Sequence, residues 1–261
     1  MRNCIILGSG RSGTSMIAGS LAPAGYFMGE HLIPAYDANP KGFFEDVEVN
    51  LINEDILAPL TRNRIVVLGR EIFRSRPIVG QRWLAHVPVG TRMPCPDGIA
   101  ARIEAVTRRL PYCFKDPRFC YTLPVWRPFL KDAVFVCVFR DPSTTAASIL
   151  KECREASYLR TLRISFSRAI KIWTEMYLHI LRDHRREGDW LFLHYDQAIA
   201  GDGLSRLERF VGARVDASFP ETGLRRSSPA RDLRVPKRVG RIYRELCDAA
   251  GYVPELAQHN S

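Results

Sequence analysis

Residues 4–18 read CIILGSGRSGTSMIA, and no other part of the sequence indicates the class of fold as clearly. Its apolar run predicts a buried strand over Asn3–Leu7, and the pattern after the glycines predicts a helix over Thr14–Ala22. A glycine-rich turn between a strand and a helix leaves backbone N–H groups pointing inward, at the positive end of the helix dipole. The stretch therefore predicts a cradle for an anionic group such as a phosphate.

The spacing of this turn matches the nucleotide-binding P-loop, G-x-x-x-x-G-K-[ST], except that Thr14 stands where the lysine would be. In ATPases and kinases that lysine reaches the β- and γ-phosphates of a triphosphate, so its loss argues against those enzymes. The positive charge lies instead inside the turn, at Arg11. A turn that binds no ligand is the alternative, which the strand before it and the helix after it disfavour.

Further apolar runs predict buried parallel strands at Tyr112–Lys115, Ala133–Phe139 and Trp190–His194. Helical patterns lie at Glu45–Leu60, Asp97–Leu110, Pro142–Cys153, Leu162–Arg186 and Ile242–Ala250. Buried strands that alternate with helices predict an α/β fold, in which helices flank a central parallel sheet on both faces. Residues 62–96 lack a clear period and are expected to form short helices and loops, and Phe219–Val239 a further loop. With no repeat or linker, residues 1–261 are expected to form a single domain.

A second junction between a strand and a helix carries polar residues that suit a ligand. The strand Ala133–Phe139 runs into Arg140, followed by Asp141, which can cap the next helix, and Pro142, which suits its first turn. Arg140 is then expected at the carboxyl edge of the sheet, where open α/β folds bind their ligands. Ser148 follows two turns into the helix. An arginine salt bridge beside a capped helix is the alternative.

The composition restricts the partners and the location. The formal net charge of +10 favours an anionic partner, although a high arginine content also follows from a GC-rich genome. Aromatic residues do not alternate with the basic ones, so nucleic-acid binding is not expected. The seven cysteines form no C-x-x-C pair and no cluster with the histidines, so we expect free thiols and no metal. Without a signal peptide or a long apolar stretch, a cytoplasmic protein with no membrane span is expected.

Both junctions resemble motifs of the sulfotransferases that use 3′-phosphoadenosine 5′-phosphosulfate (PAPS). The run Gly10–Ser15 is similar to their 5′-phosphosulfate loop, P-[KR]-[ST]-G-[TS]-[TS], in the arginine form of the tyrosylprotein and several bacterial and carbohydrate enzymes, with glycine in place of proline. Residues 140–148 are similar to their 3′-phosphate motif, R-[ND]-P-x-x-x-x-x-S. The resemblance implies a three-layer P-loop sulfotransferase-like fold, PAPS as cofactor and adenosine 3′,5′-bisphosphate as product. The cofactor-binding residues that it implies are Gly10, Arg11, Ser12, Gly13, Thr14, Ser15, Arg140 and Ser148.

Two later segments extend the resemblance. Residues 173–177 and 191–196 resemble a family segment whose tyrosine lies near the adenine, which makes Tyr195 the candidate for that contact. Ordinary core packing is the alternative for Tyr195. Arg225 and Arg226 resemble a late basic loop that closes over the 3′-phosphate, and a solvated pair is the alternative.

Sulfuryl transfer is an in-line displacement, so the protein must position the reactants, neutralise the leaving group and take a proton from the acceptor hydroxyl. The resemblance implies Arg11 beside the leaving group, and Lys115 matches the lysine of the K-T-H segment of cytosolic sulfotransferases. Pro117 stands where those enzymes place a catalytic histidine, so a histidine mechanism at that position is excluded. Many carbohydrate and tyrosylprotein sulfotransferases use a glutamate instead, and residues 39–46 resemble the corresponding stretch of bacterial members, which makes Glu45 the candidate general base. Other carboxylates that stay open as the base are Asp116, Asp46 and Glu30.

The predicted function is transfer of a sulfuryl group from PAPS to a hydroxyl of a small-molecule or carbohydrate acceptor. One alternative is a divergent P-loop kinase that uses Mg-ATP, with the ion held by Ser15 and by Asp141 or Asp196. The other is a non-catalytic nucleotide-binding module, in which Glu45 does no more than begin a helix. The expected apolar walls of the acceptor pocket are Phe43, Phe44 and Trp83.

Overall fold

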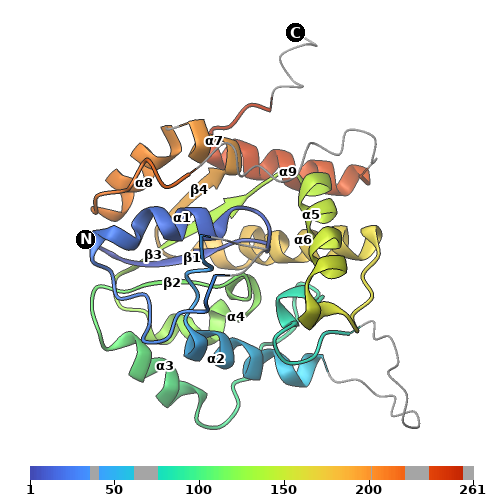
Figure 1. The fold of residues 1–261 in the computed structure, drawn as a ribbon, viewed down its shortest axis with the longest axis horizontal. Coiled ribbons are helices and arrows are strands. Elements are labelled where there is room, and N and C mark those ends of the chain that lie inside the picture. Colours follow the sequence, from blue (N-terminus) through green and yellow to red (C-terminus); the bar gives the residue numbers. More distant parts are fainter. Residues whose placement is uncertain (36–40, 62–75, 201, 221–234, 255–261) are drawn as a thin grey trace.

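The computed structural model describes residues 1–35, 41–61, 76–200, 202–220 and 235–254. In these residues four parallel strands form one sheet, in the spatial order β2-β1-β3-β4. The strands are β1 (Asn3–Leu7), β2 (Cys113–Lys115), β3 (Ala133–Phe139) and β4 (Trp190–His194). Helices cover both faces of the sheet, which confirms the predicted three-layer α/β fold (Figure 1).

The strands lie where the apolar runs predicted them, and only β2 begins one position late, at Cys113. They are buried along most of their length, as is usual when helices cover both faces of a sheet. Alternate side chains of β1 belong to opposite cores, Ile6 to one and Leu7 to the other. Because Leu7 pairs with Cys137, the carboxyl ends of β1 and β3 lie side by side. The two phosphate motifs that follow these strands therefore start at one edge of the sheet.

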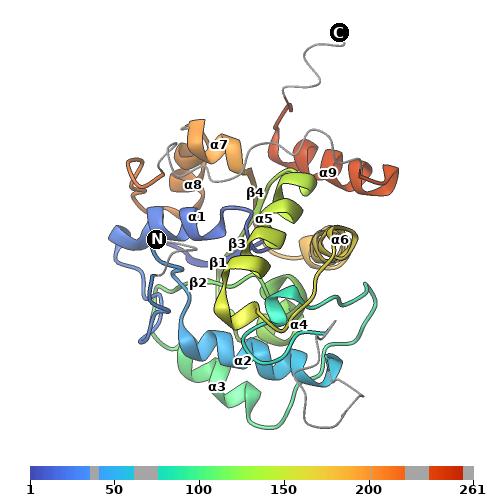
Figure 2. The same ribbon diagram turned by 45° about the vertical axis from the view of Figure 1, so that its right-hand side comes forward.

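Two groups of helices make the outer layers. The first group is α1 (Thr14–Leu21), α7 (Tyr195–Ala200) and α8 (Asp202–Val211), which form the smaller core with one face of the sheet. The second is α2 (Val47–Leu57), α3 (Ile99–Thr107), α4 (Phe119–Trp126), α5 (Pro142–Glu155), α6 (Phe166–Arg182) and α9 (Lys237–Ala250). Figure 2, where α6 is seen almost along its axis, shows α1 and α8 on one side of the sheet and α2 and α3 on the other. No helix in the described ranges combines the length and the hydropathy of a membrane span.

All six predicted helices occur, but two features differ from the predictions. The last helix begins at Lys237 instead of Ile242, because Val239 also packs into the larger core. The prediction of a loop that extends to Val239 was therefore wrong at the end of that loop. The sequence analysis also missed α4, which contains Pro124 and has buried residues on all of its sides. A helix that is apolar all round has no amphipathic period by which a pattern would reveal it.

Part of the segment expected to form short helices and loops, residues 62–75, lies outside the described residues, as do residues 221–234 of the later loop. The remainder of the first segment contains one short 3₁₀ helix, η3 (Arg82–Leu84).

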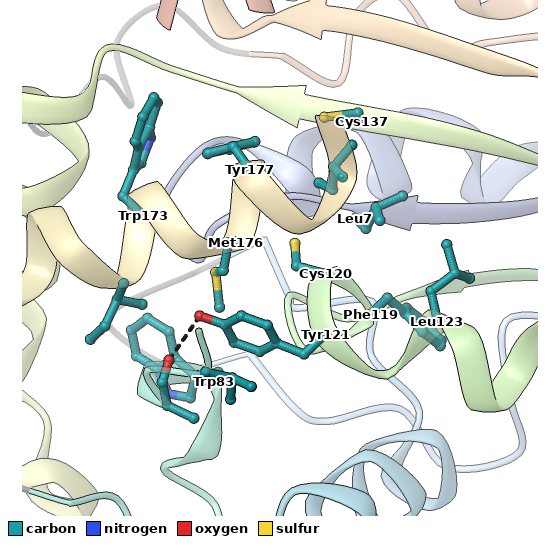
Figure 3. Packing of buried hydrophobic residues seen from close by; sticks show 14 of the residues in the cluster. Leu7, Trp83, Phe119, Cys120, Tyr121, Leu123, Cys137, Trp173, Met176 and Tyr177 are labelled. Carbon is teal, nitrogen blue, oxygen red and sulfur yellow. Dashed lines mark hydrogen bonds between the residues drawn. The ribbon is translucent and has the colours of Figure 1, made fainter. Parts of the chain in front are cut away.

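Packing between α4 and α6 supports the region below the Gly-rich loop (Figure 3). Tyr121 of α4 is fully buried, and its hydroxyl donates a hydrogen bond of 2.9 Å to the carbonyl oxygen of Ala85, directly after η3. This bond attaches the end of η3 to α4. The neighbouring Trp83 is thereby held against the loop described next.

Candidate active site

The loop between β1 and α1 has the backbone of an anion cradle. Gly8 and Gly13 have positive φ angles of 146° and 96°, which residues with a side chain rarely adopt. A Cβ atom on Gly8 would overlap the carbonyl oxygen of Val138 on β3. Gly13 is the N-cap of α1, and within the described residues no side chain caps this helix and no acidic residue lies in its first turn. The first N–H groups of α1 are therefore left to serve a ligand.

Tyr177 of α6 holds the loop from below. Its hydroxyl accepts a hydrogen bond of 3.1 Å from the backbone N–H of Ser9, donates one of 2.8 Å to the carbonyl of Val138, and lies 3.1 Å from the hydroxyl oxygen of Ser12. Burial raises the pKa of Tyr177, so the phenol keeps its proton and remains a donor. The loop is thus bound to β3 and α6 before any ligand arrives.

Aromatic rings cover two of the loop glycines. A Cβ atom on Gly10 would lie 2.5 Å from the Trp83 ring, and one on Gly13 would lie 2.6 Å from the Tyr195 ring. The family motif has a proline at the first of these positions. Glycine stands there in this chain because the indole of Trp83 occupies the space of a side chain.

Arg140 lies at the end of β3 and is buried, with a relative exposure of 6%. Its guanidinium carbon is 4.2 Å from the centre of the Tyr195 ring, a cation–π geometry. The next residue, Asp141, caps α5 by accepting hydrogen bonds of 2.8 Å from both the backbone N–H and the hydroxyl of Thr144. The structure therefore brings Arg140, Tyr195 and Gly13 together, although they come from three different segments.

Arg11 joins the two motifs directly. Its Nε donates a hydrogen bond of 3.2 Å to the hydroxyl of Ser148, two turns into α5. One of its terminal nitrogens lies 3.5 Å from a carboxylate oxygen of Glu152, which is buried. The sequence analysis did not single out Glu152. The signal that could have found it is its position four residues after Ser148, on the same face of the helix.

Lys115 connects the loop to Glu45. The Lys115 ammonium group, 2% exposed, donates a 3.1 Å hydrogen bond to the hydroxyl of Ser15 and forms an ion pair with Glu45 Oε1. The other carboxylate oxygen of Glu45 accepts a 3.1 Å hydrogen bond from the side-chain amide of Asn50 on α2. Glu45 is 8% exposed, and its two partners hold its carboxylate close to the start of α1.

Asp116 is fully buried and is connected to Glu45 through Arg118 and Asn50. Its carboxylate accepts hydrogen bonds of 2.8 Å from the backbone N–H of Arg118 and 2.9 Å from the Asn53 amide, and it forms an ion pair with the Arg118 guanidinium. Complete burial raises the pKa of Asp116 to about 6, despite the opposing effect of Arg118. Arg118 in turn donates a 2.9 Å hydrogen bond to Asn50, the residue that holds Glu45.

The other two carboxylates considered as the base have different surroundings. Asp46 is the N-cap of α2: its two oxygens each accept a 3.0 Å hydrogen bond, from the backbone N–H groups of Val49 and His31. The side chain of Glu30 is 70% exposed and lies 3.6 Å from Arg109 on the surface. Neither contacts the loop or Lys115 through any bond identified among the described residues.

The structure does not test the expected roles of two arginines. Arg225 and Arg226 lie outside the described residues. Among the residues that are described, no group of three or more His, Cys, Asp and Glu side chains is placed to hold a metal ion.

The chain resembles solved structures, among them the two described next. The sulfotransferase domain from the Synechococcus PCC 7002 olefin synthase aligns over 97% of this chain and 95% of its own, with a TM-score of 0.53 at 16% sequence identity. The sulfotransferase STF9 from Mycobacterium avium aligns over 95% of this chain and 68% of its own, with a TM-score of 0.45 at 15% identity. No protein-family model and no curated protein matches the sequence. At such low identity, the first likeness establishes a shared fold.

Proposed function

We propose that this protein is a PAPS-dependent sulfotransferase that acts on a hydroxyl group. One observation carries the proposal: the Nε of Arg11 is hydrogen-bonded to Ser148, so the loop suited to a 5′-phosphosulfate adjoins the residues suited to a 3′-phosphate. The N–H cradle after β1 and the buried Arg140 after β3 fit a nucleotide with phosphates at both positions. The shared fold with a sulfotransferase domain is consistent with this assignment.

When bound, PAPS supplies the sulfuryl group: the acceptor oxygen bonds to sulfur while the bond between sulfur and the 5′-phosphate oxygen breaks. In this proposal residues 10–15 bind the 5′-phosphate, chiefly through the N–H groups at the start of α1, and Arg11 and Lys115 stabilise the negative charge that develops on it. Arg140 and Ser148 bind the 3′-phosphate. Three points remain predictions. They are the contact of the adenine with Tyr195, the closure of Arg225 and Arg226 over the 3′-phosphate, and a single domain over residues 1–261.

Glu45 is the general base in this proposal. Its carboxylate is held beside Ser15 by Lys115 and Asn50, close to where an acceptor hydroxyl would approach the phosphosulfate. The oxygens of Asp116 and Asp46 accept hydrogen bonds from backbone and amide groups, and among the bonds identified in the described residues neither carboxylate contacts Lys115 or Ser15, which suits a structural role. Glu45 is therefore the carboxylate best placed to accept the proton.

The ammonium group of Lys115 also weakens the kinase alternative. A P-loop kinase uses the residue at the position of Ser15 to hold Mg²⁺, but here that hydroxyl accepts a hydrogen bond from a lysine cation. A second cation at the same oxygen is electrostatically unfavourable. Asp141, one of the acids considered for Mg²⁺, serves instead as the cap of α5.

Calorimetric titration tests the nucleotide class. The full chain is titrated with adenosine 3′,5′-bisphosphate in EDTA and, separately, with Mg-ATP. We expect metal-free binding of the bisphosphate and much weaker binding of Mg-ATP. A preference for Mg-ATP would support the kinase, and binding of the bisphosphate without transfer to any hydroxyl compound would support the non-catalytic module.

Glu45→Gln tests the base. The variant keeps the hydrogen bond to Asn50 but cannot accept a proton, so transfer from PAPS across a panel of sugars and phenols should fall about a hundredfold or more. Affinity for the bisphosphate, measured in the same preparation, should stay within about twofold of wild type. Glu104→Gln, on the exposed side of α3, is the matched control and should leave both quantities unchanged. An unchanged transfer rate in Glu45→Gln would move the base elsewhere.

A further inference from the structure

A buried arginine, Arg118, is connected to the proposed base through one intervening side chain. Arg118 is the N-cap residue of α4, and its side chain is 3% exposed. Its Nη1 donates a 2.9 Å hydrogen bond to Oδ1 of Asn50, and the amide nitrogen of Asn50 donates one of 3.1 Å to Oε2 of Glu45. Burying a cation is costly unless its donors are satisfied, so the position of Arg118 this close to the base calls for an explanation.

The chemistry of arginine fixes the orientation of the Asn50 amide. A guanidinium has only donors, so it can face only the carbonyl oxygen of that amide. The NH₂ group then points the other way, where it donates to Glu45 and, at 3.3 Å, to the backbone carbonyl of Asp46. An amide turned over would present its oxygen to the Glu45 carboxylate and repel it. Arg118 therefore ensures that Glu45 faces a donor.

Two buried carboxylates hold the guanidinium of Arg118 in place. One oxygen of Glu54 lies 2.8 Å from Nε and 2.7 Å from Nη2, and Asp116 lies 3.0 Å from Nη1. Glu54 is held in turn by Arg82 of η3, through an ion pair of 2.7 Å. A planar guanidinium bound along two edges keeps one orientation, whereas a lysine in its place could not serve both carboxylates and Asn50.

The contacts of Glu45 bear on its protonation. The charged groups around it are Lys115 at the end of β2, Asp116 and Arg118 between β2 and α4, and Asp46 and the buried Glu54 on α2 and at its cap. Lys115 binds Oε1 of Glu45, and Asn50 binds Oε2. Each hydrogen bond to a carboxylate favours its ionised form, so loss of the Asn50 donor would make Glu45 easier to protonate. A protonated Glu45 cannot accept the proton of an acceptor hydroxyl.

We propose that Arg118 is a positioning residue for the general base: acting through Asn50, it keeps an amide donor on Oε2 of Glu45. Glu45 is thereby kept ionised and in one orientation while Lys115 binds its other oxygen. Arg118 itself touches neither cofactor nor acceptor in this proposal. The inference rests on the proposed sulfotransferase function and adds to it the residue that keeps the base ready for proton transfer.

The pH dependence of transfer tests the amide contact. Asn50→Leu removes the donor, so the acid limb of kcat/KM for transfer from PAPS should move about one pH unit higher. Asn50→Asp keeps an oxygen for Arg118 but places a second carboxylate against Glu45, so its limb should move further in the same direction. Affinity for adenosine 3′,5′-bisphosphate should stay within about twofold of wild type in both variants. An acid limb at the wild-type position in both variants overturns the proposal.

Asn3→Leu is the matched control for a purely structural effect. Asn3 is as buried as Asn50, at 8% against 9% exposure, and its amide donates a 2.7 Å hydrogen bond to the carbonyl of Lys131. It lies at the amino end of β1, opposite to the end that carries the site. Asn3→Leu should lower the unfolding temperature and leave the acid limb in place. An equal shift of the limb in Asn3→Leu would mean that lost stability alone explains it, and the proposal would fail.

A double-mutant cycle tests whether Arg118 acts through Asn50. Arg118→Lys alone should lower kcat about tenfold and move the acid limb as Asn50→Leu does. Added to Asn50→Leu, it should lower kcat by about twofold or less, because the contact through which it acts is already gone. Independent, multiplying losses would contradict the role of Arg118. Glu54→Gln, which weakens the hold on Arg118, replaces Arg118→Lys in the cycle if thermal unfolding shows that Arg118→Lys is misfolded.

A readout that needs no transfer separates the two proposals. The Glu45 carboxyl carbon is titrated with pH by NMR of protein labelled with ¹³C-glutamate, and its signal is assigned by its absence in Glu45→Gln. The midpoint should move to higher pH in Asn50→Leu and Asn50→Asp but not in Asn3→Leu. If no hydroxyl compound accepts a sulfuryl group, the proposed function fails while this titration still decides whether Asn50 keeps Glu45 ionised. An unmoved midpoint in both Asn50 variants overturns the inference even where transfer is observed.

Discussion

Two arginines face the candidate nucleotide site, and their surroundings suit different tasks. Arg140 is buried against the Tyr195 ring at the end of β3, in a position held by the backbone of the sheet. Arg11 has a side chain that is 23% exposed and lies between Ser148 and Glu152. A buried, stacked guanidinium is pre-organised to recognise one phosphate, whereas a more exposed one can follow charge that develops during transfer.

Arg140→Ala should separate recognition of the 3′-phosphate from recognition of the 5′-phosphate. We expect affinity for adenosine 3′,5′-bisphosphate to fall about thirtyfold or more, because a charge-assisted contact is lost, while adenosine 5′-phosphate loses about threefold or less. Calorimetry of both nucleotides with wild type and variant provides the measurement. Arg140→Lys keeps the charge but not the planar contact and should give an intermediate loss for the bisphosphate. Equal losses for the two nucleotides would show that Arg140 does not bind the 3′-phosphate.

At the scale of elements, α5 carries several parts of the site on one rigid body. Its N-cap is Asp141, directly after Arg140, and its inner face presents Ser148 and Glu152 to Arg11. The helix packs against α6 and buries Ala146 and Ile149 in the larger core. A substitution at the cap should therefore change both the free energy of unfolding and the affinity for the nucleotide.

Asp141→Ala should lower the free energy of unfolding by about 1 kcal/mol, because the N–H of Thr144 loses its acceptor. It should also weaken bisphosphate binding, since the start of α5 orients Arg140. Chemical denaturation and calorimetry on one preparation give both values. Asp141→Asn retains a capping oxygen and should restore most of the stability. If Asn destabilises the protein as much as Ala, the charge of Asp141 rather than its capping bond is what matters.

For the whole molecule, buried histidines couple stability to pH. His184 is 3% exposed and its Nε2 forms a 3.0 Å hydrogen bond with the carbonyl of Cys120, which links η6 (His184–Arg186) to α4. Burial lowers the pKa of His184 to about 4. The unfolded chain therefore binds a proton near its ordinary pKa while the folded chain does not, and stability is lost as the pH falls from about 6.5 to about 4.

The loss assigned to His184 is on the order of 3 kcal/mol over that range. Denaturant unfolding at pH 7 and at pH 4.5 should show a smaller acid-induced loss in His184→Gln than in wild type. His31→Gln, at an exposed position, is the control and should follow the wild-type pH dependence. Parallel pH profiles for wild type and His184→Gln would contradict the assignment.

Local sequence patterns were enough to predict the strands, the Gly-rich loop and the cap of α5. Continuous apolar runs such as Ala133–Phe139 can be covered only in the interior of a sheet, so their positions follow from composition alone. The position of Gly13 and the capping role of Asp141 depend on a few neighbouring residues, which is why they were predictable. The α/β fold followed from the alternation of these local elements.

Which distant residues come into contact depends on the tertiary structure. The ion pair of Lys115 with Glu45 and the bond of Arg11 to Ser148 join residues separated by 70 and 137 positions, and no local pattern contains that information. The strand order β2-β1-β3 creates both contacts, because it places the segments after β2 and β3 on either side of the loop after β1. Glu152 escaped the sequence analysis because only folding brings it near Arg11, and α4 escaped it because a helix buried on all sides has no amphipathic period.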